Sequence, residues 1–200
     1  MKHINRLFPA AAALLTLLSM TACGASSDAV QESAAEPAKT SAASEETAAF
    51  HPASLPSIML TSENLHDGVW DAEISNTKQG ANRSPQLAWQ PVEGASCYAV
   101  YMVDTTVNYW LHWKSLNIKE TSLAAGSIPD TEYIGPYPPS GTHDYEIRVF
   151  ALKEPAKEEQ SRFDNQNSGF EQMTAALDQT ENGSGNILAY GTLTGSYTRT

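Results

Sequence analysis

Residues 97–103 read Cys-Tyr-Ala-Val-Tyr-Met-Val, a run of almost wholly apolar side chains that Asp104 follows directly. A short apolar run bounded by polar residues is typical of a strand that is buried on both of its faces. We therefore expect this run to be a central strand of a sheet. The carboxylate of Asp104 then emerges where the strand ends.

Other β-like segments surround this run and are separated by turn-forming residues. They cover residues 57–61, 86–89, 110–118, 145–152 and 186–193. One segment has helical spacing, with an apolar face formed by Phe170, Met173 and Leu177. Ser168 and Glu171 match a capping box before it, and an Asn-Gly pair at 182–183 is expected to end it. The pattern predicts a β-rich sandwich or barrel over residues 51–200, with one or two peripheral helices.

The N-terminus has the features of a bacterial lipoprotein signal. Lys2 and Arg6 precede a mostly apolar run over residues 7–18, which is too short to span a membrane. Small residues then precede Cys23, as in a lipobox. We expect residues 1–22 to be removed and the Cys23 sulfur to carry a lipid, which anchors the protein to a membrane outside the cytoplasm. The alternative is an ordinary signal peptide with an incidental cysteine.

Residues 23–50 are rich in Ala, Ser, Glu and Thr and contain no aromatic residue before Phe50. Such a segment cannot bury enough apolar surface to offset the entropy lost on ordering. We therefore interpret residues 23–50 as the lipidated cysteine followed by a disordered tether.

Composition excludes several classes of protein. The 200 residues include 12 Lys and Arg against 23 Asp and Glu, a net charge of −11, which disfavours a nucleic-acid partner. Two cysteines cannot form a disulfide framework, and Cys97 within its apolar run is interpreted as inert packing. Phosphate-binding loops, dinucleotide fingerprints and hydrolase motifs are absent, so we expect no cofactor and no enzymatic activity.

Four side chains form a candidate set of ligand-binding groups. They are Asp104, His112, His143 and Tyr145, and a stiff proline-rich loop at residues 135–141 precedes the last two. On a strand, residues 143 and 145 share one face. Imidazole and phenol groups can donate hydrogen bonds to phosphate oxygens, and a carboxylate behind an imidazole favours its cationic form. Taken singly, each residue could equally serve packing or a turn.

The ordered set of these motifs resembles the phosphatidylethanolamine-binding protein family, in particular its bacterial Raf-kinase-inhibitor-like branch. The match covers about residues 56–200. It is carried, in the order of the family, by residues 80–89, 101–104, 112–113, 135–139, 143–145 and 187–197.

The resemblance implies an antiparallel β-sandwich with a small pocket for phosphate-like groups and phospholipid headgroups. Matched motif by motif, the pocket residues are Asp104, His112, Pro139, His143 and Tyr145. Two departures are evident. The family motif Asp-Pro-Asp-Ala-Pro reads Asp-Thr-Thr-Val-Asn at 104–108, which puts the second carboxylate of the pocket and its rim in doubt. Asp144 replaces a basic residue and, facing away, should alter the surface rather than the pocket.

These observations predict a lipid-anchored binding module that captures a small anionic or phosphorylated ligand. The alternative is a protein-interaction module, such as a protease or signalling inhibitor, which uses the pocket rim and the proline-rich loop to bind a protein partner. A third interpretation is a metal-dependent hydrolase with Asp104, His112 and His143 as ligands.

Overall fold

The computed structural model describes residues 54–157 and 159–200. The predicted signal peptide (1–22), Cys23 and the tether (23–50) lie outside them. The strands are β1 (Leu60–Thr61), β2 (Leu65–His66), β3 (Val69–Trp70), β4 (Leu87–Trp89), β5 (Cys97–Asp104), β6 (Trp110–Ile118), β7 (Ser122–Leu123), β8 (Gly141–Leu152), β9 (Gln179–Thr180), β10 (Gly183–Ser184) and β11 (Ile187–Arg199). The helical elements are α1 (Phe170–Ala175) and the single turns η2 (Ala72–Ile74) and η3 (Ala176–Asp178).

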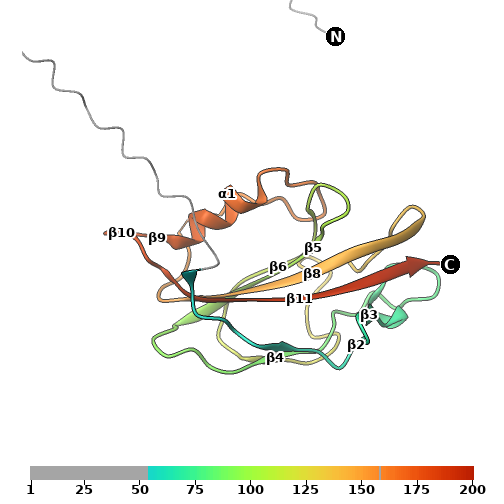
Figure 1. The fold of residues 1–200 in the computed structure, drawn as a ribbon, viewed down its shortest axis with the longest axis horizontal. Helices are drawn as coiled ribbons and strands as arrows, with labels where there is room; N and C mark the ends of the chain where they lie inside the picture. Colours follow the sequence, from blue (N-terminus) through green and yellow to red (C-terminus); the bar gives the residue numbers. More distant parts are fainter. Residues whose placement is uncertain (1–53, 158) are drawn as a thin grey trace, which may run out of the picture. The chain divides into compact units, whose positions relative to one another are not determined.

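The main sheet has six strands in the order β2-β3-β11-β8-β5-β6. A three-stranded sheet in the order β1-β4-β7 covers one of its faces, and α1 covers the other (Figure 1). The strands pair antiparallel, except that β3 and β11 are parallel where Ser196 meets Val69. The predicted mainly β sandwich with a peripheral helix is confirmed.

Strand β5 is buried along its whole length and contributes to two hydrophobic clusters. Tyr98, Val100 and Met102 pack between the sheets with Trp89. The alternate side chains pack under the helix with Phe170; they are Cys97, Ala99, Tyr101 and Val103. Burial of one large apolar side chain contributes about 1.5–3 kcal/mol, so both faces hold this strand in register. The prediction of a central strand is confirmed.

The other predicted strands are mostly present but differ at their ends. Strand β8 begins at Gly141, four positions before the expected start, and β11 continues to Arg199. Both extensions exist because the two strands pair with each other as far as Gly141 and Arg199. The expected first strand at 57–61 is largely wrong, since Ser57 makes only a single bridge to Tyr190 and β1 has two residues.

The predicted helix is present but short. It ends at Ala175 and continues as the single turn η3. The carboxylate of Glu171 accepts a hydrogen bond from Arg148, so it does not serve as the expected capping partner of Ser168. The Asn-Gly pair at 182–183 lies in the β9-β10 hairpin and not at the helix end. Within the described residues, no helix is long and apolar enough to cross a membrane.

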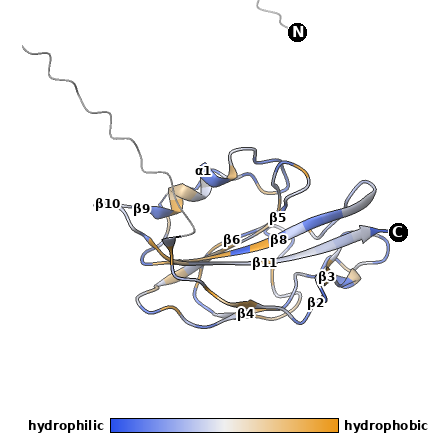
Figure 2. Ribbon diagram, in the orientation of Figure 1, coloured by the Kyte–Doolittle hydropathy of each residue, from blue (hydrophilic) through white to orange (hydrophobic). Residues whose placement is uncertain are grey.

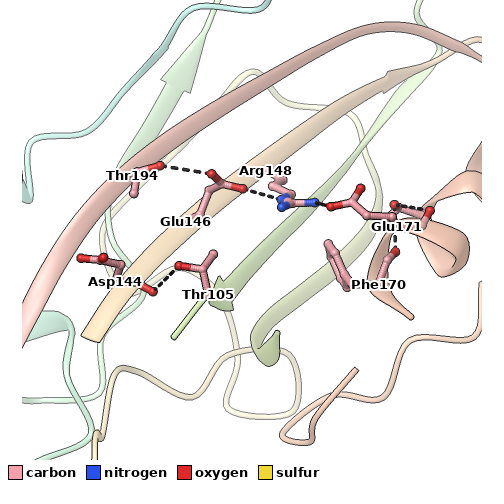
Figure 3. A network of polar contacts seen from close by, with 8 residues as sticks. Thr105, Asp144, Glu146, Arg148, Phe170, Glu171 and Thr194 are labelled. Carbon is pink, nitrogen blue, oxygen red and sulfur yellow. Dashed lines mark hydrogen bonds and ion pairs between the residues drawn. The ribbon is translucent and has the colours of Figure 1, made fainter. Parts of the chain in front are cut away.

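A buried cation ties α1 to the sheet (Figure 3). Arg148 donates to Glu146 Oε1 from Nε at 2.6 Å and to Glu171 Oε1 from Nη1 at 2.8 Å. Its guanidinium carbon lies 5.1 Å from the centre of the Phe170 ring. Thr194 on β11 donates to Glu146 Oε2. Figure 2 shows that one part of β8 is hydrophilic and the rest is mostly hydrophobic, and the sequence of β8 places Glu146 before its apolar end at 149–152.

We predict that Gly135→Ala lowers the free energy of unfolding by about 3 kcal/mol or more, because overpacking of this kind is costly. A Cβ at Gly135 would lie 1.9 Å from the Ile74 carbonyl oxygen, so the proline-rich loop would have to move. The matched control is Gly169→Ala, where the nearest atom is 3.5 Å away. Urea denaturation of both variants measures the difference, and equal stability of the two would contradict this account.

Candidate functional site

The ends of β5, β6 and β8 meet the proline-rich loop around a cavity of about 410 Å³. The structure brings together all five residues that the sequence indicated: Asp104, His112, Pro139, His143 and Tyr145 line this cavity. Their meeting follows from strand register, because Asp104 on β5 lies opposite both Trp110 on β6 and Tyr145 on β8.

Asp104 and His143 form a buried hydrogen-bonded pair. The Nδ1–H of His143 donates to Asp104 Oδ2 at 2.6 Å, and the side chains are only 10% and 5% exposed. The other carboxylate oxygen accepts the backbone N–H of Thr106 at 2.9 Å. Both oxygens of Asp104 are thus hydrogen-bonded, which fixes the imidazole and leaves its Nε2 available.

His112 is held in one tautomer by the backbone. Its Nδ1 lies 2.9 Å from the carbonyl oxygen of Ile134, which can only accept, so Nδ1 carries a proton. Burial lowers the pKa of His112 from 6.5, although the Ile134 carbonyl and the Asp104 carboxylate act in the opposite direction. Near neutral pH the ring is therefore uncharged, and its Nε2 is a hydrogen-bond acceptor.

Tyr145 lies between the two imidazoles. Its ring centre is 5.2 Å from that of His112 and 6.4 Å from that of His143. The side chain is fully buried, and its hydroxyl makes no well-aligned hydrogen bond to a described residue; its nearest polar neighbour is the Asp104 carboxylate. Burial and the nearby Asp104 carboxylate raise its pKa, so the hydroxyl keeps its proton and can donate.

Sequence reasoning missed the aromatic rim of the cavity. Trp110 Nε1 and the Tyr137 hydroxyl donate to the same oxygen of Asp164, at 3.0 and 2.6 Å. Both aromatic residues line the cavity, together with Val107 from the altered 104–108 segment. No local sequence pattern predicts that Asp164 binds Trp110 and Tyr137, because it is distant in sequence from both. The departure from the family motif thus changes the rim and leaves Asp104 in place.

Arg199 is a second residue that sequence reasoning missed. It lines the cavity, where its Nη1 donates to the carbonyl oxygens of Pro138 and Pro139 at 3.2 and 3.3 Å. The extended pairing of β11 with β8 places it there, opposite Gly141. It supplies a fixed positive charge at the mouth, whereas Asp104 is the only acidic residue among the described residues of the lining.

Two further expectations concern the surroundings of this cavity. Asp144 is exposed between the buried His143 and Tyr145, so it faces away as expected. Its backbone N–H donates to the Thr106 hydroxyl, and its carbonyl oxygen accepts from the Thr105 hydroxyl. Figure 3 shows Asp144 on the same side of β8 as Glu146 and Arg148. Throughout the described chain, no group of three or more His, Cys, Asp or Glu side chains is placed to hold a metal ion.

Known proteins resemble this chain in sequence and in structure. A UPF0098 protein of the archaeon Methanothermobacter thermautotrophicus is 33% identical over 97 residues, which are 38% of this chain and 64% of that relative. The chain thus spans less than two thirds of that relative's length.

Two solved structures share the fold. A phosphatidylethanolamine-binding protein homolog of Chlamydia trachomatis has a TM-score of 0.56 and 22% identity, and YbcL of E. coli has a TM-score of 0.52 and 23% identity. Each comparison covers 72% of this chain and 99% of the other. The family model described as phosphatidylethanolamine-binding protein matches residues 62–198. That range contains the whole cavity except Arg199, and the chain belongs to the phosphatidylethanolamine-binding protein family.

Proposed function

We propose that this protein is a lipid-anchored binding module outside the cytoplasm, whose cavity holds a phosphate-like group or a phospholipid headgroup. Membership of the family supports a binding module in general. The anionic ligand, the anchor at Cys23 and the location are the parts that we add.

One observation carries the choice of ligand: the buried Tyr145 hydroxyl, which makes no well-aligned hydrogen bond and has only the Asp104 carboxylate near it. A buried donor left unpaired costs about 1–3 kcal/mol, so its place in the wall of a cavity is accounted for by a ligand that accepts its hydrogen bond. Arg199 and the Nε2 atoms of the two histidines surround the same space. A compact oxyanion suits this set once an imidazole nitrogen is protonated.

The negative charge of the whole protein does not prevent such binding. Charges in solvent are screened over about 8 Å at physiological salt, so the local groups decide. We further propose that the ligand is held without a chemical step. This part of the proposal rests on family membership, which supports a binding module in general.

The alternative of a protein-interaction module needs an exposed proline-rich loop. Pro136 and Pro138 are buried, and the exposed residues of the loop are Pro139, Ser140 and Gly141. The carbonyl oxygens of Pro138 and Pro139 are also occupied by Arg199. No observation therefore favours a protein partner at this loop over a small ligand in the cavity.

We predict that Tyr145→Phe weakens binding of glycerophosphoethanolamine about tenfold or more, because a hydrogen bond to a charged group is lost. The free energy of unfolding should change little, since the hydroxyl makes no well-aligned hydrogen bond in the ligand-free protein. Tyr101→Phe is the matched control: its hydroxyl is equally buried and likewise makes no well-aligned hydrogen bond, but it lies under the helix, outside the cavity. Calorimetry and urea denaturation give both quantities. A loss of stability in Tyr145→Phe without a loss of affinity would refute the proposed role.

We predict that affinity for this phosphodiester falls as pH rises from about 5.5 to about 8. In the ligand-free protein His112 has a pKa below 6.5, and its Nε2 carries a lone pair. An anion can bind there only when Nε2 takes up a proton and donates it in a hydrogen bond, so the bound anion must raise the pKa of His112. Binding is then strongest below the pKa of the free protein and weakens as pH rises through the pKa of the complex, by at most about tenfold per pH unit for one proton. Calorimetry in buffers of different ionisation enthalpy should detect proton uptake. His112→Asn should abolish the uptake, and an unchanged slope in that variant would exclude His112.

The anchor is tested separately. In a bacterial host supplied with an alkyne-labelled fatty acid, the full chain should carry the label and sediment with membranes. Cys23→Ser should lose both the label and the sedimentation with membranes, because the lipid on the cysteine holds the protein at the membrane. Cys97→Ser is the matched control, since Cys97 is a buried free thiol. Label retained in Cys23→Ser would contradict the anchor.

A further inference from the structure

A groove of about 420 Å³ lies directly beside the cavity. Tyr137 and Arg199 form part of both walls, so the two hollows adjoin at these side chains. The rest of the groove comes from residues 76–79 and Thr200, whose backbone oxygen accepts from the side-chain amide of Gln79. The groove is thus an extension of the cavity on the far side of Arg199.

Hydrogen bonds hold the 76–79 segment in place. The backbone N–H of Asn76 donates to the Pro136 carbonyl oxygen at 3.0 Å. The Thr77 hydroxyl lies 3.0 Å from that of Tyr197 on β11. The groove wall is therefore fixed to the same proline-rich loop and the same strand that form the cavity, and it can present its side chains in a constant arrangement.

The charged side chains of the groove are cationic, although the protein as a whole is acidic. Lys78 and Arg199 line it, whereas none of its described lining residues is an Asp or a Glu. Lys78 makes no ion pair or hydrogen bond in the described part of the chain, although Lys114 and Lys157 pair with glutamates. Arg199 uses only Nη1 on the proline carbonyls, which leaves further N–H donors available. Neither cation forms an ion pair with another of the described residues.

We propose that this groove is a second subsite and that the ligand carries two anionic groups. One phosphoryl group occupies the cavity, and a second phosphoryl or carboxylate group lies between Arg199 and Lys78. This inference rests on the proposed function, since it assigns the first group to the cavity. A ligand with one anionic group uses only half of the cationic surface.

The experiment compares methylphosphonate, which has one anionic group, with methylene-, ethylene- and propylene-diphosphonate, which have two. Each is titrated calorimetrically into the full chain in detergent at constant pH and ionic strength. We expect at least one diphosphonate to bind about tenfold more tightly than methylphosphonate. Lys78→Gln should weaken that diphosphonate about threefold or more and leave methylphosphonate unchanged, because Lys78 lies outside the cavity.

Lys153→Gln is the matched control. Lys153 is exposed just after the other end of β8, and the same charge change there should affect no ligand. Equal affinity for methylphosphonate and every diphosphonate would overturn the second subsite while leaving the cavity proposal intact. An equal loss of affinity for methylphosphonate and the diphosphonate in Lys78→Gln would overturn it too, since that pattern indicates long-range electrostatic attraction and not a local contact. Absence of binding by all four compounds would overturn both proposals.

Discussion

The arrangement of this protein depends on the register of one strand. β5 is paired on both edges, with β6 and β8, and buried on both faces. A shift by one residue would turn its side chains to the opposite faces, so two packed clusters resist any slip. This constraint sets Asp104 at the sheet end opposite Tyr145 and within reach of His143. The contact between Asp104 and His143 in the cavity follows from that placement.

Strand β8 uses its two faces for different purposes. Its odd-numbered residues carry His143 and Tyr145 into the cavity, where polar groups are held ready for a ligand. Its even-numbered residues carry Arg148, whose carboxylate partners and the Phe170 ring attach the helix. The first set leaves hydrogen-bonding capacity unused, and the second set satisfies its own. That difference distinguishes a binding wall from a structural one.

Much of this could be predicted from residue pattern alone. The apolar run at 97–103 indicates a doubly buried strand, and the spacing of His143 and Tyr145 indicates a shared face, because local periodicity reports which side chains are buried together. The ends of β8 and β11 could not be predicted in this way. Polar stretches such as 194–199 have no apolar signal, and they become strand only because a partner strand lies beside them.

What the amino-acid sequence determined by itself was the strand-rich class of the domain and the core strand, since apolar periodicity is a property of neighbouring positions. Five of the residues around the cavity followed from the resemblance of its motifs to a known family. Only the tertiary structure decided the tautomer of His112, the surroundings of the Tyr145 hydroxyl, the rim held by Asp164 and the position of Arg199 beside the groove. Each of these depends on contacts between segments far apart in the chain, and the distance between such segments is set by packing.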